Sequence, residues 1–325
     1  MTQHLPIAVD PAIRRVTLGA SSLDLLPMAL GGSWYATEVD DADLIGAMEA
    51  AYEGGLRHYD TAAGYGAGRS EDLLGRFLAD KRDSVFLASK ASPPELTAAA
   101  MLGMVEQSIK RLGTDAIDLY YIHWPRAGRD MRPVMEGLEQ ARRQGKIGAV
   151  GVSNFSIPQM RQVEEVGPIA AHQLGYNLLW RHTETEIIPY CRQRGIAVIA
   201  YSALAHGILT GKYGRTPDIA PGDQRHTILP FRADIWPHVH SGVGKLKDLA
   251  SDLGLPLPTL AIRWILDRAG ITGVVAGARN RSQAAANVAA LAPAIPAGAY
   301  AAMTAISDEI TTHVPDVGNL FDHYP

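Results

Sequence analysis

Four side chains in this sequence would together make a proton donor for a carbonyl oxygen. Asp60 and Tyr65 lie in HYDTAAGYGAGRSE (58–71), Lys90 ends the apolar run VFLASK, and His123 ends IDLYYIH. A free tyrosine has a pKa of about 10 and is a weak acid at neutral pH. Because a nearby ammonium stabilises a phenolate, we expect Lys90 to lower the pKa of Tyr65. Asp60 would keep Lys90 charged, and His123 would orient a substrate oxygen.

Such a site can protonate an oxygen but has no hydride to give, so a cofactor would have to supply the reducing equivalent. Two other interpretations of these residues remain open. Asp60 and Lys90 could form a structural ion pair beside a core histidine, because ion-pair networks also shift pKa values. His58, Asp60 and His123 could instead hold a metal in a barrel hydrolase, although Lys90 would be an unfavourable neighbour for it. We favour the proton donor and expect no metal.

The elements that must position these side chains form a regular series. Nearly continuous apolar runs alternate with helical patterns, as expected of parallel strands covered by helices. Eight such units predict a (β/α)8 barrel, whose active site lies at the carboxyl ends of the strands. A doubly wound sheet is disfavoured because no G-x-G-x-x-G turn follows a strand. The runs are 26–32, 57–62, 85–90, 117–123, 147–154, 170–177, 197–204 and 273–278.

Several segments stand outside this series. RRVTLGASSLDLLP (14–27) predicts an N-terminal β-hairpin that caps one end of the barrel. Residues 205–238 and the tail PDVGNLFDHYP are longer than ordinary loops, and we place long loops at the C-terminal face. Ser70, before Glu71 and an apolar run, is typical of a helix N-cap. We treat residues 1–325 as one domain, since no linker or repeat divides them.

The composition excludes several classes of partner. The 325 residues carry 30 basic and 34 acidic side chains, a net charge of −4, without a basic stripe for nucleic acid or a membrane surface. A single cysteine, Cys191, excludes an internal disulfide and is interpreted as a packing residue. The N-terminus lacks the apolar core of a signal peptide, and no run is long enough to span a membrane. We expect a cytoplasmic protein, and its oligomeric state stays open.

Five motifs in order along nearly the whole chain resemble the aldo-keto reductase family. They are GLRHYDTAAGYGAGRSEDLLG, DLYYIHWP, GKIGAVGVSNFS, QLGYN and YSAL, and five in this order are highly specific. The resemblance implies an oxidoreductase that transfers hydride between a nicotinamide cofactor and an aldehyde, ketone or sugar. It also implies that Asp60, Tyr65, Lys90 and His123 form the catalytic tetrad, with Tyr65 as general acid or base. The alternative is a regulatory subunit that binds cofactor without turnover.

The same resemblance implies where the cofactor binds. Polar residues at the ends of the fifth and sixth strands, Ser153, Asn154 and Gln173, would hold the nicotinamide carboxamide. Tyr201 would stack on the nicotinamide ring, and Lys212 would lie near the pyrophosphate. Strand-end polar residues can also serve local turns, and Tyr201 can be a core aromatic. The residues assigned to cofactor binding are Ser153, Asn154, Gln173, Tyr201, Ser202, Leu204, Gly207, Lys212, Gly277, Ala278, Arg279, Gln283 and Asn287.

The motif GARNRSQAAANV (277–288) resembles the family's binding site for the adenosine end, at a helix N-terminus suited to phosphate. Many relatives carry Glu before the Asn, where this chain has Ala286. Relatives that begin the motif with Lys-Ser use those residues for a 2′-phosphate, and this chain has Gly-Ala there. Arg279 and Arg281 could supply the missing charge. We therefore favour NADP(H) and leave NAD(H) open.

Aromatic residues would wall the substrate pocket. Trp34 and Tyr35 follow the first strand, and Trp124 follows the fourth. Phe231 and Trp236 in the long segment are candidates that we interpret rather as packing residues. Aromatic walls with few polar groups suit a small carbonyl compound or a sugar, which is the partner we expect.

Overall fold

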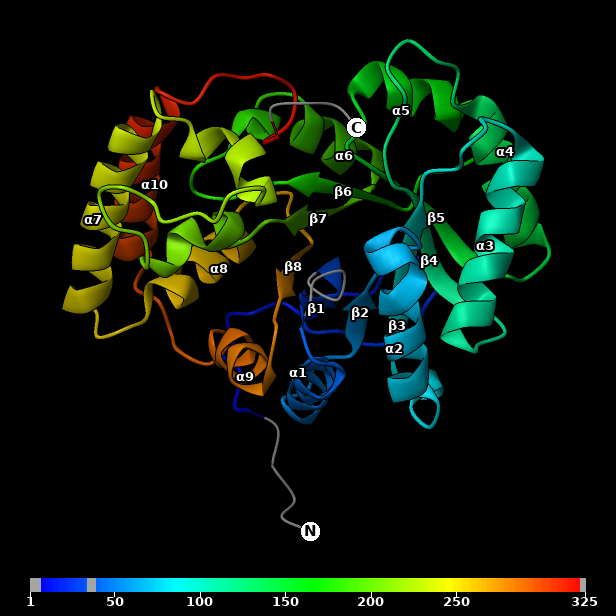
Figure 1. Ribbon diagram of the computed structural model, residues 1–325, viewed down its shortest axis with the longest axis horizontal. Helices are drawn as coiled ribbons and strands as arrows, with labels where there is room; N and C mark the ends of the chain where they lie inside the picture. Colours follow the sequence, from blue (N-terminus) through cyan, green and yellow to red (C-terminus); the bar gives the residue numbers. More distant parts are fainter. Residues whose placement is uncertain (1–6, 34–38, 322–325) are drawn as a thin grey trace.

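The computed structural model describes residues 7–33 and 39–321. In this part of the chain, eight parallel strands close into a barrel in chain order (Figure 1). Each of the eight apolar runs coincides with one strand, with β3 extending one residue beyond its run, so the predicted (β/α)8 barrel is confirmed. The strands are β1 (Met28–Gly31), β2 (His58–Asp60), β3 (Phe86–Ala91), β4 (Ile117–Ile122), β5 (Ile147–Ser153), β6 (Ala171–Gly175), β7 (Ala197–Tyr201) and β8 (Gly273–Gly277).

Helices follow the strands and cover the outside of the barrel (Figure 1). Two of them, α7 and α8, lie between β7 and β8, and two more follow β8. The Gly residues that end α3 and α6 have φ of 60° and 70°, the C-cap geometry that their sequences indicate. The helices are α1 (Asp41–Glu53), α2 (Arg69–Leu78), α3 (Ala98–Leu112), α4 (Arg132–Arg143), α5 (Ile157–Glu164), α6 (Ile187–Arg194), α7 (Trp236–Asp252), α8 (Leu257–Asp267), α9 (Arg281–Ala289) and α10 (Ala297–Thr311).

The N-terminal segment closes the amino end of the barrel, but the predicted hairpin is not confirmed. Its only antiparallel pairing among the described residues is one bridge, in which Val16 and Leu25 exchange backbone hydrogen bonds of 2.8 and 2.9 Å. Leu18 and Leu25 nevertheless join the apolar cluster inside the barrel, together with Phe86. Burial of these two leucines, rather than strand pairing, holds the segment in place.

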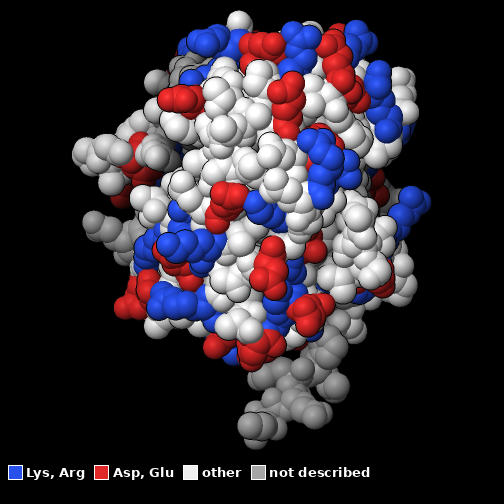
Figure 2. Space-filling model, turned by 90° about the vertical axis from the view of Figure 1, so that its right-hand side faces the viewer, with Lys and Arg blue, Asp and Glu red and all other residues white. Residues whose placement is uncertain are grey.

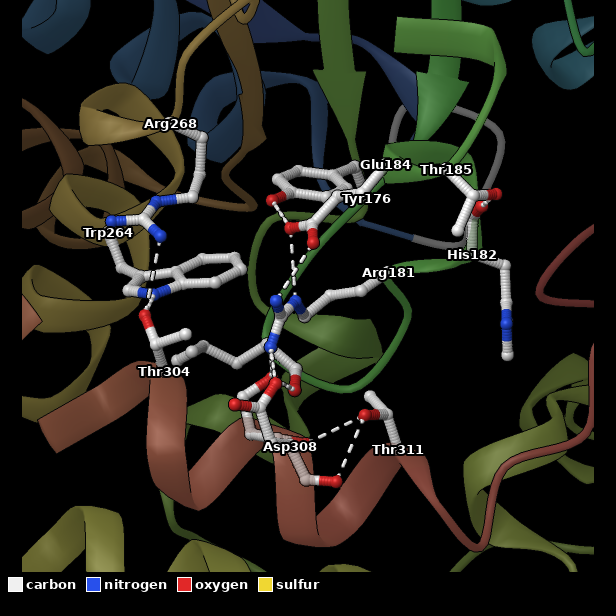
Figure 3. A network of polar contacts seen from close by, with 12 residues as sticks. Tyr176, Arg181, His182, Glu184, Thr185, Trp264, Arg268, Thr304, Asp308 and Thr311 are labelled. Atoms are coloured by element: carbon white, nitrogen blue, oxygen red, sulfur yellow. Dashed lines mark hydrogen bonds and ion pairs between the residues drawn. The ribbon is translucent and has the colours of Figure 1, made fainter. Parts of the chain in front are cut away.

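A polar network ties α10 to the end of β6 (Figure 3). The guanidinium of Arg181 donates to Glu184 at 3.0 and 2.8 Å and also pairs with Asp308 on α10. Tyr176, from the QLGYN motif, donates its hydroxyl proton to Glu184 and stacks on Trp264 with ring centroids 5.5 Å apart. This motif therefore contributes a structural anchor just beyond the strand end.

The outer surface is mixed in charge where it can be seen. Figure 2 shows acidic and basic side chains interspersed over the face on which α3 and α4 lie in Figure 1. None of the helices in the described ranges is both long enough and apolar enough to cross a bilayer.

Candidate active site

The carboxyl ends of β2 and β3 place Asp60 and Lys90 in direct contact. Lys90 Nζ donates to Asp60 Oδ1 at 2.6 Å and to the Thr61 carbonyl oxygen at 2.9 Å. Gln173 Nε2, from β6, donates to the other carboxylate oxygen of Asp60 at 2.8 Å. Burial is the largest single effect and disfavours the charge on Lys90, but the charges and hydrogen bonds of Asp60 and Tyr65 together outweigh burial, and the pKa of Lys90 is raised. Lys90 therefore stays an ammonium at neutral pH.

Tyr65 lies beside this pair, in the loop between β2 and α2. Lys90 Nζ is 5.2 Å from the centroid of the Tyr65 ring, and the ring of His123 lies 5.7 Å away, edge to face. Burial, the largest effect, raises the pKa of Tyr65, while the charge and hydrogen bond of Lys90 act to lower it. The net direction is upward. Lys90 does lower the pKa of Tyr65, as expected, but by less than burial raises it. The expectation that the pKa of Tyr65 lies below its usual value is therefore wrong for the protein without cofactor.

The backbone of the Tyr65 loop is unusual. Gly66, Ala67 and Gly68 have φ of 59°, 53° and 103°, three successive residues in the left-handed region. Gly68 is the N-cap of α2, so the prediction that Ser70 caps this helix is wrong. The Ser70 hydroxyl instead hydrogen-bonds the Thr61 hydroxyl at 2.6 Å, because it already lies in the first helical turn. The two ends of this loop are therefore held in fixed positions, at Thr61 and at the start of α2.

His123 follows β4 and is neutral. Burial, with a smaller contribution from the charge of Lys90, holds the pKa of His123 well below its usual range. The His123 backbone N–H donates to the Ala91 carbonyl at 2.9 Å, and its own carbonyl accepts from Asn154 Nδ2 at 3.2 Å. A neutral imidazole can donate one N–H to a substrate oxygen without competing with Tyr65 as the acid.

The ends of β5, β6 and β7 bring the predicted carboxamide-binding residues next to these four side chains. Asn154 Nδ2 donates to Ser153 Oγ at 3.0 Å, and Asn154 Oδ1 accepts from the Tyr201 hydroxyl at 2.7 Å. Gln173 already contacts Asp60. Amide and hydroxyl groups that can both donate and accept hydrogen bonds thus lie near the half-buried ring of Tyr201. Such groups fit an aromatic ring that carries a carboxamide.

The segment after β7 has a backbone shaped for close approach. Ser202, Ala205, His206 and Gly207 all have positive φ, between 46° and 92°. A Cβ built on Gly207 would lie 3.3 Å from Lys212 Nζ, so the ammonium covers this glycine. Leu204, in contrast, packs against the apolar core. The positive φ angles of this segment, together with the exposed ammonium of Lys212, suit the binding of an anionic group such as a pyrophosphate.

At the start of α9, the polar side chains hold the backbone. Gln283 Oε1 accepts from the Arg279 N–H at 3.0 Å, and Asn287 Nδ2 donates to the Gly277 carbonyl at 3.1 Å. Ala278 is fully buried, so neither its side chain nor its backbone is exposed to a nucleotide in this structure. Arg281 Nη2 donates to both carboxylate oxygens of Glu53, on α1, at 2.8 and 2.9 Å. Arg281 thus joins the start of α9 to α1.

The predicted aromatic walls divide into three groups. Trp34 and Tyr35 lie outside the described residues. Trp124 is half-buried beside His123, with ring centroids 6.3 Å apart. Phe231 and Trp236 are buried and stack on each other at 5.5 Å, which agrees with their interpretation as packing residues.

Sequence reasoning missed the residue that faces Trp124. The ring of Phe321, from the C-terminal tail, lies 5.9 Å from Trp124 and 5.8 Å from His206. The tail is held by a bridge between Phe321 and Ile228 and by a hydrogen bond of 3.2 Å from the Leu229 N–H to the Leu320 carbonyl. The only local signal was the length of the tail, because a contact across some 200 residues leaves no periodic pattern.

The metal-site interpretation gains no support. Asp60 already accepts from Lys90 and Gln173, so both of its oxygens are engaged. Within residues 7–33 and 39–321, no three His, Cys, Asp or Glu side chains are arranged to hold a metal ion.

Comparison with known proteins agrees with the fold. The family model described as "Aldo/keto reductase family" matches residues 27–308. The chain is 36% identical to aldo-keto reductase YhdN of Bacillus subtilis, over 81% of this chain and 83% of that protein. It is 29% identical to the NADH-specific methylglyoxal reductase of Escherichia coli, over 86% of this chain and 94% of that protein.

Among solved structures, the glycerol dehydrogenase AKR11B4 of Gluconobacter oxydans superimposes with a TM-score of 0.84 at 29% identity, covering 94% of this chain and 97% of that one. The family match, the relatives and the fold agree with one another. The chain therefore belongs to the aldo/keto reductase family and is a nicotinamide-dependent oxidoreductase of carbonyl or alcohol substrates.

Proposed function

We propose that Tyr65 is the general acid in carbonyl reduction and the general base in the reverse direction. The observation that carries this proposal is the position of Tyr65 beside Lys90, whose ammonium is held by Asp60 at 2.6 Å. The Tyr65 hydroxyl gives its proton to the substrate oxygen as negative charge develops there, and the ammonium stabilises the phenolate that remains. His123, neutral and adjacent, donates an N–H that orients the same oxygen.

The bound nicotinamide nucleotide supplies or accepts the hydride. Ser153, Asn154 and Gln173 would hold its carboxamide, and Tyr201 would support its ring. Gln173 contacts Asp60, and Asn154 contacts Ser153, Tyr201 and the His123 carbonyl oxygen.

The remaining contacts follow the segment after β7 and the start of α9. Lys212, above Gly207, pairs with the pyrophosphate, and the α9 N-terminus receives the adenosine end. We favour NADP(H), with Arg279 at the 2′-phosphate, because Arg279 matches the cofactor-binding motif of the family by position. A relative that is NADH-specific makes this preference a direct subject for experiment.

The substrate we propose is a small carbonyl compound, or the corresponding alcohol or sugar. Trp124 and Phe321 form aromatic walls beside His123, which suits a short ligand with one reacting oxygen. The relatives named for methylglyoxal and glycerol act on compounds of this size.

The test is Tyr65→Phe, which keeps the ring and removes the proton. Activity is followed by dihydronicotinamide absorbance over a panel of aldehydes and sugars with NADPH and NADH, and cofactor binding by fluorescence titration. We expect turnover to fall by about 100- to 10,000-fold with cofactor affinity retained. Full turnover in the variant would refute the role of Tyr65. A wild-type chain that binds cofactor but turns over no member of the panel would point to a regulatory subunit.

A further inference from the structure

We propose that the buried ion pair between Glu71 and Arg111 is a positioning element that sets Tyr65 against Lys90. This inference rests on the proposed function of Tyr65. Glu71, in the first turn of α2, is fully buried. Glu71 Oε2 accepts from Arg111 Nε of α3 at 2.6 Å, and Oε1 accepts from the Ser89 hydroxyl of β3 at 2.6 Å. One carboxylate thus joins two helices and one strand of the barrel.

The contact with Ser89 fixes the strand that carries Lys90. Successive side chains of a strand point to opposite faces, so Ser89 points to the helices while Lys90 points into the barrel. Both side chains are buried, and Lys90 donates to Asp60 on the inner face. Ser89 therefore contacts Glu71 on the outer face of β3, and Lys90, the next residue, contacts Asp60 on the inner face.

The contact with Arg111 fixes the other end of the Tyr65 loop. A Cβ built on Gly68 would lie 2.7 Å from Arg111 Cδ and 2.9 Å from Arg111 Nε, so this side chain packs directly on the last loop residue. Just before it, Ala67 has φ of 53°, in the left-handed region that is unfavourable for a residue other than glycine. Such a conformation persists only where its surroundings hold it, and Arg111 supplies that restraint.

Ser70, the residue before Glu71, completes the arrangement. Its hydroxyl bonds the Thr61 hydroxyl at 2.6 Å and donates to the Gly32 carbonyl at 3.1 Å, while the Thr61 carbonyl accepts from Lys90. Tyr65 lies between these two attachment points, at Thr61 and at Gly68. The loop can therefore place the phenol beside the ammonium without any direct contact between Glu71 and Tyr65.

A purely structural role makes a different prediction. Replacement of a buried ion pair by apolar residues of similar size is often neutral or stabilising, whereas removal of one partner is costly. If Glu71 and Arg111 serve stability alone, the double variant Glu71→Leu/Arg111→Met should fold and turn over like the parent. If they position Tyr65, the double variant should fold but turn over slowly.

The experiment compares this double variant with the parent in thermal unfolding, NADPH fluorescence titration and steady-state reduction of methylglyoxal and 4-nitrobenzaldehyde. We expect a similar melting temperature and cofactor affinity, with kcat lower by about 10- to 100-fold and KM little changed, as for a misplacement of about 1 Å. The alkaline limb of the kcat profile should move to higher pH, because Lys90 would stabilise the Tyr65 phenolate less well. A parent-like kcat and pH profile would overturn the inference.

Further variants keep the test decisive. Arg111→Lys retains the charge and should recover most of the kcat lost in Arg111→Met, and Glu71→Gln retains the volume if the double variant fails to fold. The control is Asp10→Leu/Arg263→Met, which removes another buried pair, with side chains 8% and 3% exposed, and should leave kcat unchanged. Tyr65→Phe separates the two proposals. If it is fully active, the proposed function fails; if it is inactive while Glu71→Leu/Arg111→Met is normal, only the positioning role fails.

Discussion

Lys90 Nζ and Asp60 Oδ1 lie 2.6 Å apart, with side chains only 1% and 3% exposed to solvent. A buried pair of this kind loses much of its Coulomb energy to the desolvation of both ions, so it is weak evidence for stability. Its value lies in keeping a fixed positive charge beside Tyr65. The role of the pair can be tested, because removal of Lys90 alone and removal of both residues should have different effects on stability.

Lys90→Met should abolish most activity and also destabilise the fold. Among the described residues, the variant leaves Gln173 as the one hydrogen-bond partner of the buried Asp60 side chain, and we place the loss of stability at about 3–5 kcal/mol. Turnover should fall at least about 100-fold, because no cation remains to stabilise the phenolate. Urea unfolding and dihydronicotinamide absorbance measure the two effects.

The double variant Lys90→Met/Asp60→Leu provides the control for that experiment. It should recover most of the lost stability, since no unpaired charge remains, yet stay inactive. Recovery of turnover together with stability would show that the pair is structural only.

Two arginines at the start of α9 should differ in their effect on cofactor choice. Arg279→Ala should weaken NADPH binding by about 10- to 100-fold and leave NADH binding unchanged, through loss of a charge-assisted contact to the 2′-phosphate. Arg281→Ala is the matched control, because its guanidinium pairs with Glu53 and is half exposed. That pair is worth at most about 1 kcal/mol in stability. Equal affinities of Arg279→Ala and its parent for NADPH would contradict the assignment.

Much of the barrel was predictable because its signals are local. Each strand is a short apolar run, and the polar residue that ends it, such as Asp60, Lys90 or His123, must lie at the common carboxyl edge. The net pKa of Tyr65 was not predictable, because it depends on the balance between burial and a charge whose distances only the fold sets. The contact of Phe321 with Trp124 joins the tail to the β4 end, and no sequence period records such a contact.

The same limit applies to Ser70 and Glu71, whose sequence pattern predicts a helix start. Both residue types are typical of a first helical turn, and the helix does begin there. The sequence cannot show that their side chains turn inward, to Ser89 and Thr61, instead of capping the backbone. Burial of polar groups against specific partners is decided by the tertiary arrangement.

His58 should make the protein less stable in mild acid. It is buried on the inner face of β2, Nε2 has no hydrogen-bond partner among the described residues, and burial lowers its pKa from 6.5 to about 4. Because the unfolded chain binds this proton below pH 6.5 and the folded chain does not, stability falls as the pH drops from 6.5 to about 4 and then levels off. The contribution is up to about 3 kcal/mol.

The measurement for His58 is urea unfolding at pH 7 and pH 4.5. His58→Leu should reduce the loss of unfolding free energy between the two conditions. His172, with a pKa lowered to about 3 by burial, should account for a further part of the loss that remains. An identical pH dependence in His58→Leu and its parent would rule out this histidine as the source.

Phe321 should control which carbonyl compounds the enzyme accepts. Its ring fills the space between Trp124 and His206 at the barrel mouth, and the Phe321–Ile228 bridge keeps it there. Phe321→Ala removes this wall, so we expect kcat/KM for methylglyoxal to fall relative to that for the larger 4-nitrobenzaldehyde by about 10-fold or more. The change should appear in KM, since Tyr65 and Lys90 are untouched. Val317→Ala, an exposed position in the same tail, is the control and should leave the ratio as it is. If Phe321→Ala and Val317→Ala show the same ratio, the tail does not line the substrate site.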